Sequence, residues 1–530
     1  MRVFKDFKRL IQERQIIKDF SKYIKGQIPK ERNRDSRKLS LFELNINYSG
    51  HVGYASFAAS FLAQGHKLVG YSPESRKALK SRFTFWVFSS IKALLGTSRP
   101  FYIYRTFGVT QFLNPKLDKD YVFEIDSYFK TKGDLLAWKI EGILVGDLFY
   151  DWHLRKREIP TVTFGAEQFQ QDLKIFIKHF VFWTKYFSKF HVQNVVVSHG
   201  VYLQGLVARI GMKYGSKVYL VSAERVYQLS EVNLLSDREY LEYDPTQLTQ
   251  QNYRINLDRA QKQLNDVLTN SAPLNSAHAS LNGFAGIPYN RNLRVEKETL
   301  GVLIACHCFS DSPHADGGLL FADFWEWLIF LGEKSLLSPE IWYIKAHPAF
   351  NDSDLYWFKV FCELYPNIIP LDSHISNLSL YETCIDVVLT VHGTIAFEAS
   401  YLGIPVINAS LNSPHVRYPF SITPPNVKEY EETISNLKRV IEKFEIDKSS
   451  VIHFYDLHHV RRMESWLLGN NYVDFLSQFP NYKDRFESLE VLRYFEKKDK
   501  NGTLISECTR VANKFMAEDT YKLHEVVKWS

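Results

Sequence analysis

Short apolar runs alternate with helical patterns along the chain from about residue 39 onward. The run "LSLFELNI" (39–46) predicts a strand, and the polar-glycine turn "YSGHVG" leads from it into a helix of small residues. A second strand, "HKLVGY" (66–71), completes a βαβ unit, the repeating element of a parallel sheet. The same alternation predicts strands over 142–151, 192–199 and 217–222, with a helix over 201–216.

A second series of the same kind begins at residue 300. It predicts strands over 300–308, 340–348, 367–371, 384–393 and 404–409, with helices over 318–334, 354–366 and 394–403. Such alternation is typical of a largely parallel, doubly wound sheet. The stretch 262–295 between the two series is rich in Asn, Ser, Ala and Gly, which indicates an interdomain connection.

The two ends of the chain have a different character. Residues 1–38 place apolar side chains at close to helical spacing among thirteen Lys/Arg and five Asp/Glu, a net charge of +8. This basic amphipathic arm either lies on an anionic membrane or packs on the body of the protein. From about residue 427 the pattern is helical and rich in polar residues. The sequence therefore predicts an α/β protein with two Rossmann-like doubly wound domains facing across a cleft, and helical N- and C-terminal extensions. The predicted units are 1–38, 39–290, 291–425 and 426–530.

Charge and composition narrow the functional classes. The whole chain carries +6, so the body outside the arm carries −2, which argues against nucleic acid as a partner. Five cysteines make no disulfide framework, and a reducing compartment is expected. Charged residues interrupt the first thirty positions, which is unlike a secretory signal. The sequence has no run of about 18 apolar residues, the length needed to span a bilayer. We expect a cytoplasmic protein, with peripheral contact to the inner membrane as an option.

Polar side chains follow three strands of the second series. Ligands of open parallel sheets bind at the carboxyl ends of the strands, so these residues are the first candidates for a site. No nucleotide fingerprint of the GxGxxG or Walker type accompanies them. The candidates, in chain order, are His307, Ser310, Asp311 and His314; then Lys345, His347 and Pro348; then His392, Gly393 and Thr394.

The "VHGT" turn predicts an anion site. Gly393 permits a tight turn from strand to helix, and the first N–H groups of that helix lack partners. The Thr394 hydroxyl is either a further donor to a ligand or a simple N-cap. Glu398, one turn into the helix, can accept hydroxyls of a ribose or sugar. Lys345 and His347 are either solvated loop residues or groups that face a phosphate.

These motifs bear a family resemblance. "YIKAHP", followed about forty residues later by "LTVHGTIAFEASYLGIPVI", resembles the donor half of GT-B glycosyltransferases that build bacterial surface and capsular polysaccharides. The chain is most similar to the Kdo-transferase-like group, which has a His-Pro motif. "HCFSDSPH" and "VGDLFYDWHLR" also resemble surface-polysaccharide proteins. The resemblance implies that His347 and Thr394 bind the phosphate and ribose of a CMP-linked donor. His-Gly-Thr here replaces the commoner Ser-Ser or Gly-Ser pair, and the E-x7-E pattern of many retaining enzymes is absent.

The resemblance implies metal-independent transfer of a sugar, with Kdo or another acidic sugar as one option, to a growing surface glycan or glycolipid. No cofactor and no metal is expected, because the "CHC" side chains diverge along an extended chain. A polyol-phosphate (CDP-glycerol-type) transferase would place phosphates at the same histidines, and a non-catalytic polysaccharide assembly protein is a further alternative. The fold also serves nucleotide-sugar epimerases, but these carry a doubled glycine and paired glutamates where this chain has "HGTIAFEAS".

Transfer needs a base that deprotonates the acceptor hydroxyl, and we expect it in the first half of the chain. Asp147 and Asp151, which follow "ILVG", are the first choice, and His51 in "YSGHVG" is the second. His199 and Glu224 are the other candidates at strand ends.

A stripe of lysines runs along a predicted helix over 173–190. In "LKIFIKHFVFWTKYFSKF" four lysines share one side of a predicted helix, and Phe and Trp occupy the other. This is either a core helix with a solvated stripe or a surface that faces a membrane carrying lipid-linked acceptors.

Overall fold

The computed structural model describes most of the chain. The described residues are 2–29, 38–74, 99–118, 129–223, 225–235, 257–268, 286–289, 299–412, 415–460, 466–467, 472–479 and 482–518. The candidate Glu224 and much of the predicted connection (269–285 and 290–298) lie outside them.

The first domain is built on a six-stranded sheet with the order β3-β2-β1-β6-β7-β8, in which only β8 runs antiparallel to its neighbour. Without the separate two-stranded hairpin β4-β5, this is the Rossmann order of strands. The strands are β1 (Leu39–Glu43), β2 (Lys67–Tyr71), β3 (Gln111–Leu113), β4 (Lys139–Ile140), β5 (Ile143–Leu144), β6 (Val192–Val197), β7 (Lys217–Val221) and β8 (Val226–Leu229).

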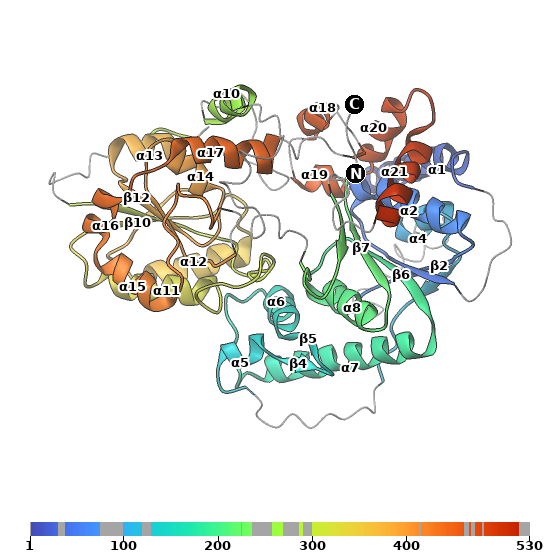
Figure 1. The fold of residues 1–530 in the computed structure, drawn as a ribbon, viewed down its shortest axis with the longest axis horizontal. Helices are drawn as coiled ribbons and strands as arrows, with labels where there is room; N and C mark the ends of the chain where they lie inside the picture. Colours follow the sequence, from blue (N-terminus) through green and yellow to red (C-terminus); the bar gives the residue numbers. More distant parts are fainter. Residues whose placement is uncertain are drawn as a thin grey trace.

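Helices cover both faces of this sheet (Figure 1). Successive side chains of a strand point to opposite faces, so Leu41 joins the cluster beneath α6, α7 and α8, while Phe42 joins the cluster with α2 and α4. This explains why the strands read as continuous apolar runs. The helices are α2 (His51–Ala63), α4 (Arg99–Thr106), α5 (Lys132–Leu136), α6 (Gly146–Arg157), α7 (Glu167–Lys189) and α8 (Tyr202–Lys213), with a 3-10 turn η1 (Tyr48–Gly50) before α2.

The second domain repeats the plan with a parallel five-stranded sheet of order β11-β10-β9-β12-β13. Its strands are β9 (Gly301–Ala305), β10 (Ile341–Lys345), β11 (Ile369–Leu371), β12 (Val387–Thr390) and β13 (Val406–Asn408). Its helices are α10 (Leu257–Leu268), α11 (Phe324–Ser335), α12 (Asp352–Leu364), α13 (Asn377–Thr383), α14 (Ile395–Tyr401), α15 (Val427–Ser435), α16 (Leu437–Lys443) and α17 (Lys448–Tyr455), followed by a π-turn η2 (Asp456–Val460).

One predicted strand is wrong. Residues 142–151 form only the short strand β5, and helix α6 begins at Gly146. Glu141 (φ 52°) and Gly142 (φ 80°) make the tight turn of the β4-β5 hairpin. Gly146 then touches the preceding helix, since a Cβ there would lie 1.8 Å from the carbonyl oxygen of Leu135. An apolar run of this length is compatible with either a buried strand or a buried helix, and its periodicity alone does not distinguish the two.

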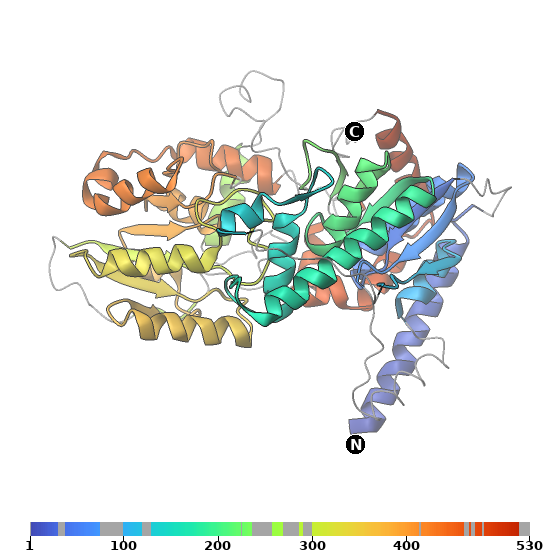
Figure 2. The same ribbon diagram turned by 90° about the horizontal axis from the view of Figure 1, so that it is seen from below.

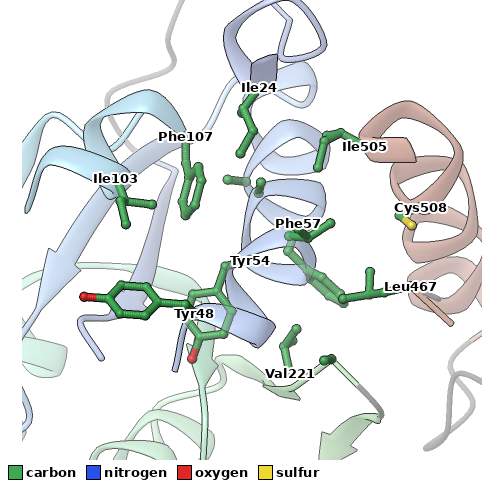
Figure 3. Close-up of a cluster of buried hydrophobic side chains, with 14 of the residues drawn as sticks. Ile24, Tyr48, Tyr54, Phe57, Ile103, Phe107, Val221, Leu467, Ile505 and Cys508 are labelled. Atoms are coloured by element: carbon green, nitrogen blue, oxygen red, sulfur yellow. The ribbon is translucent and has the colours of Figure 1, made fainter. Parts of the chain in front are cut away.

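The N-terminal arm is helix α1 (Arg2–Lys25), which runs out from the first domain to the N-terminus (Figure 2). Ile16, Ile17, Phe20 and Ile24 are at most 3% exposed, inside the same cluster as α2. Figure 3 shows Ile24 pointing into this cluster from one side and Ile505 from another. Of the two alternatives for the arm, packing on the body is therefore the one observed for its described side chains.

The predicted C-terminal extension is helical but divides between the domains. Helices α15 to α17 pack on the second domain, where Tyr430 and Phe454 are buried. The chain then returns to the first domain (Figure 1), where Trp466 and Phe515 join the cluster around α2 and α1. The returning helices are α18 (Tyr472–Gln478), α19 (Tyr482–Glu487), α20 (Glu490–Lys498) and α21 (Leu504–Glu518). The predicted fold class, two Rossmann-like α/β domains with helical N- and C-terminal extensions, is confirmed.

Candidate functional site

The carboxyl edge of the second sheet is organised around His307. This residue follows β9, and its Nε2 lies 3.1 Å from Oγ1 of Thr390 and accepts the N–H of Val391 at 3.2 Å. Strands β9 and β12 are neighbours where the strand order reverses, the topological switch point of the sheet. Burial lowers the pKa of His307, and the nearby His392 and His347 lower it further. His307 is thus a neutral ring that holds the loop after β12, and it supplies no positive charge to a phosphate.

His392 stacks on His307, with ring centroids 4.7 Å apart and planes tilted by 20°. Its Nδ1 lies 3.4 Å from Oδ2 of Asp316, while its Nε2 is buried without a hydrogen-bond partner among the described residues. Burial lowers the pKa of His392, although Asp316 partly opposes this. The sequence motif "VHGT" therefore provides an imidazole nitrogen that a ligand can satisfy.

Close packing favours glycine at position 393, because a Cβ there would lie 3.0 Å from Oγ1 of Thr390, a tight contact that this oxygen would have to relieve by moving. That oxygen also accepts the Gly393 N–H at 3.2 Å. Thr394 precedes the seven-residue helix α14 and is exposed, and its side chain makes no capping hydrogen bond. Thr394 therefore occupies the N-cap position without its hydroxyl capping the helix.

Lys345 and Glu398 are both buried and influence each other electrostatically. Along β10, Lys345 alternates with Trp342 and Ile344 and so points to the other side of the strand. Lys345 is 7% exposed. Its ammonium group donates to the Ile375 carbonyl at 2.6 Å and to Asn377 at 2.5 Å. Burial lowers its pKa to about 8, against the raising effect of Glu398 and Asp372. Lys345 is thus neither a solvated loop residue nor an open phosphate ligand, because the alternation along the strand turns it into the domain.

Glu398 is 4% exposed, and its Oε1 has no hydrogen-bond partner among the described residues. Burial raises the pKa of Glu398 to about 7, although Thr394 and Lys345 lower it. A buried polar atom without a partner costs about 1–3 kcal/mol. Glu398 stands one turn into the helix that follows the switch-point strand β12.

His347 follows β10 and is half-buried. Its Nδ1 accepts the N–H of Ala349 at 3.2 Å and lies 3.5 Å from the Cys308 sulfur. Because Nδ1 is an acceptor, Nε2 carries the proton and is a donor. The backbone N–H of Phe350 bonds to the His347 carbonyl at 3.1 Å, so the exposed Pro348 occupies a tight turn. His347 is the candidate best placed to donate to an anion.

The loop after β9 forms the interface with the first domain. His314 is 6% exposed, with Nδ1 2.6 Å from Oδ1 of Asp151 and Nε2 3.0 Å from the Ala322 carbonyl. Both ring nitrogens face acceptors, so the ring is a charged imidazolium, and Asp151 raises its pKa against the effect of burial. Burial also raises the pKa of Asp151, while the hydrogen bonds from His314 lower it.

Further contacts continue this interface. Asp311 pairs with Arg155 and accepts a hydrogen bond from Tyr202 at 3.2 Å, and Ser310, one residue before it, is buried. Asp323 accepts hydrogen bonds from Tyr150, at 2.5 Å, and from Thr161. The predicted cleft residues Ser310, Asp311 and His314 therefore lie where the two domains touch.

The three residues predicted as catalytic are committed elsewhere. Asp147 is held by Arg209 through two hydrogen bonds of 2.6 Å, and Asp151 by His314. Both lie on helix α6, not at a strand end, because the predicted strand is a helix. His51 is 0% exposed and packs against Tyr104 and Phe107, and burial lowers its pKa to about 3. The expectation that these residues stand at strand ends is therefore wrong, whereas their catalytic role stays a prediction.

Glu43 and Ser198 were not singled out in the sequence. Glu43 ends β1, and its Oε2 accepts from the Ser198 backbone N–H at 2.6 Å and from its hydroxyl at 2.8 Å. Ser198 in turn lies 2.7 Å from Nδ1 of the exposed His199. In the sequence, the only sign of these contacts is a single glutamate at the end of an apolar strand.

No protein-family model and no curated protein sequence matches the chain. Similar solved structures include a UDP-GlcNAc 2-epimerase from Neisseria meningitidis bound to UDP-GlcNAc, with 10% identity, a TM-score of 0.25, and coverage of 80% of this chain and 99% of that one. A glycosyltransferase from Rickettsia africae has 9% identity, a TM-score of 0.24 and coverage of 85% and 99%. The calicheamicin glycosyltransferase CalG4 has 10% identity, a TM-score of 0.25 and coverage of 85% and 99%.

Such low scores carry no argument about activity. The strand orders of the two sheets, with a polar cluster at each switch point, define the chain as a two-domain α/β protein of GT-B-like architecture.

Proposed function

We propose that this protein is a nucleotide-sugar-dependent glycosyltransferase whose donor binds at the carboxyl edge of the second sheet and whose acceptor binds at the first. The observation that carries the proposal is the buried carboxylate of Glu398, whose Oε1 has no partner among the described residues, next to the switch point. A ribose presents two adjacent hydroxyls that can donate to such an oxygen. Fold-level resemblance alone would not support this function.

The chemistry of the leaving group fits the same edge. Transfer leaves a phosphate or diphosphate whose negative charge grows in the transition state, and preorganised donors stabilise such charge. His347 offers Nε2–H as such a donor. This donor would act without a metal ion. Lys345 acts indirectly in this proposal, because its positive charge lowers the pKa of Glu398 against the effect of burial.

The finer assignment follows the sequence resemblance. We propose a CMP-linked donor carrying Kdo or another acidic sugar, and a growing bacterial surface polysaccharide or glycolipid as acceptor. A polyol-phosphate transferase would use the same phosphate site, but its product would contain a phosphodiester.

A membrane-bound acceptor would place the protein at the inner face of the membrane. None of the helices that the structure describes has the length and hydropathy that crossing a bilayer requires. The apolar side of α7 is buried, with Phe176 and Trp183 at 0% exposure, so this helix is a core helix. Its exposed lysines Lys174, Lys185 and Lys189 remain available for anionic lipid headgroups.

A thermal-shift screen with CMP, CDP, UDP and GDP tests the function. Nucleotide at a hundred times its dissociation constant stabilises the native state by about 2.7 kcal/mol, and we expect one nucleotide to do so. His347→Ala should weaken that nucleotide's affinity about tenfold or more, the cost of one charge-assisted hydrogen bond. His374→Ala is the matched control, since His374 is an exposed histidine after β11, away from the switch point. A protein that none of the four nucleotides stabilises would contradict the proposal.

A further inference from the structure

The switch point of the first sheet carries a hydrogen-bonded chain that the donor site does not use. We propose that His199, oriented by Ser198 and Glu43, is the general base that removes the proton from the acceptor hydroxyl. This inference rests on the proposed glycosyl transfer and assigns its proton-accepting residue.

The direction of the hydrogen bonds sets the tautomer of His199. A carboxylate only accepts, so the Ser198 hydroxyl, 2.8 Å from Glu43 Oε2, donates to it. The Ser198 oxygen then accepts from His199 Nδ1 at 2.7 Å, which places the ring proton on Nδ1. Nε2 consequently holds the lone pair. Glu43, at 1% exposure, also accepts the Ser198 N–H, so the whole arrangement is anchored in the sheet.

The hydrogen-bonded series Glu43–Ser198–His199 lies where ligands of such sheets bind. Strands β1 and β6 are neighbours at the point where the order of the first sheet reverses, and Glu43 and Ser198 stand at their carboxyl ends. Ligands of open α/β sheets bind outside the carboxyl ends at such a point. The exposed ring of His199 lies directly at this edge. His307 and Thr390 occupy the corresponding place in the second sheet.

The loop that bears His199 is also fastened to the donor domain. Tyr202, three residues on, bonds through its hydroxyl to Asp311, at 3.2 Å, and to Ser312. Those partners belong to the loop after β9, which also carries His307. Tyr202 has φ of 54°, an uncommon conformation for a bulky residue and one that surrounding contacts must hold. The strained turn therefore sets His199 beside the interface between the acceptor and donor domains.

The proposed step conserves atoms and charge. The acceptor O–H bond breaks and its proton passes to Nε2 of His199. The acceptor oxygen forms a bond to the anomeric carbon, and the bond from that carbon to the phosphate oxygen breaks with its electron pair on the nucleotide. Histidine suits this role because its ordinary pKa lies near neutral pH. The charged ring that forms is stabilised through Ser198 by the carboxylate of Glu43.

The other predicted bases do not compete in the described part of the chain. Asp147 and Asp151 are paired with Arg209 and His314, and His51 is enclosed by aromatic rings. Among the described candidates, His199 alone combines exposure with an orienting partner at the switch point.

The test compares His199→Ala with His191→Ala. His191 is an exposed histidine just before the other end of β6, so its variant controls for loss of a surface imidazole. Nucleotide release is measured from CMP-N-acetylneuraminic acid, UDP-N-acetylglucosamine, GDP-mannose and CDP-glycerol, with mono- and disaccharide acceptors. We expect His199→Ala to lower kcat about 100-fold or more while KM for the donor and the nucleotide thermal shift stay unchanged. Added imidazole should restore part of the rate, which a purely structural defect would not allow.

Ser198→Ala keeps the imidazole but removes its orienting partner, so we expect a smaller loss of kcat, about tenfold, with unchanged donor KM. A His199→Ala protein that keeps more than a third of the wild-type rate would overturn the inference and leave the proposed function standing. If wild-type protein neither binds nucleotide nor releases it from any of the four donors, the proposed function fails, and the assignment of His199 fails with it.

Discussion

Lys345 shows how a charged residue at the end of an apolar run can find its partners inside the domain. Strand alternation turns Lys345 away from the cluster of Trp342 and Ile344, so its ammonium meets Asn377 within the domain. Removing the charges of Lys345 and Glu398 from water is costly, so each pKa shifts in the direction that favours the neutral form of the group. The pKa of Lys345 falls to about 8, and the pKa of Glu398 rises to about 7. The pair is therefore sensitive to pH near neutrality.

Glu398→Gln tests this pair. A folded-state pKa of about 7 lies above the ordinary 4.5, so the native protein binds the extra proton more tightly than the unfolded chain. The resulting stabilisation is complete below pH 4.5 and is lost as the pH rises through 7, a loss of about 3 kcal/mol. We expect the free energy of unfolding of the wild type to fall across that window relative to Glu398→Gln, as measured by urea unfolding. Glu382→Gln, at an exposed position in α13, should keep the wild-type dependence.

At the scale of elements, helix α1 illustrates two readings of one amphipathic pattern. Its described apolar side lies in one buried cluster with residues of α2, α4, α20 and α21. Polar contacts tie this end of the chain to the region of α20 and α21. Tyr23 donates to Asp499 at 2.5 Å, and Gln27 accepts the Ile505 N–H at 2.9 Å. The apolar side chains of α1 that the structure describes as buried, Ile16, Ile17, Phe20 and Ile24, are packed in the first domain.

Phe20→Ala measures this packing. Phe20 is 0% exposed, and truncating a buried phenylalanine costs about 3–5 kcal/mol. We expect a loss of that size in the free energy of unfolding, obtained from denaturant titration. Lys18→Ala, on the exposed side of the same helix, should change it by less than about 0.5 kcal/mol. Equal effects of the two substitutions would contradict the packed arrangement.

At the scale of the whole molecule, buried polar contacts join the two domains. Asp151 of α6 meets His314, and Asp323 accepts from Tyr150 and Thr161. The chain also crosses back after η2, so that C-terminal helices complete the first domain (Figure 1). These contacts connect the two domains in a defined relation, as the proposed transfer reaction requires.

Two substitutions compare the stability contributed by a buried and by an exposed interdomain contact: Asp151→Asn and Asp311→Asn. Asp151 is 2% exposed, so removing its charge leaves the His314 imidazolium uncompensated, at a cost of about 3 kcal/mol or more. Asp311 is 60% exposed, and loss of its pair with Arg155 should cost at most about 1 kcal/mol. The urea midpoint should fall markedly for the first variant and little for the second. Similar midpoints for both would show that the buried pair does not stabilise the interface.

Most strands and their order along the chain follow from the sequence, because hydrophobic alternation is a local property. The strands at 39–46, 192–199, 300–308 and 340–348 all appear at the predicted places. The error at 142–151 arose because a short apolar run does not distinguish a buried strand from a buried helix. The sequence also placed His307, His392 and Thr394 at neighbouring strand ends, since parallel strands bring their carboxyl ends to one edge.

Tertiary structure alone decided what each polar residue does. Asp151 and His314 are 163 residues apart in the chain, and Glu43 and Ser198 are 155 apart, so no local spacing reveals either contact. The same holds for the burial of Lys345 and for the two ends of the chain meeting on the first domain. The sequence by itself determined two α/β halves and predicted the edge at which we propose that ligands bind. Which side chains face that edge depended on long-range packing, because only packing selects the polar groups that find partners inside the protein.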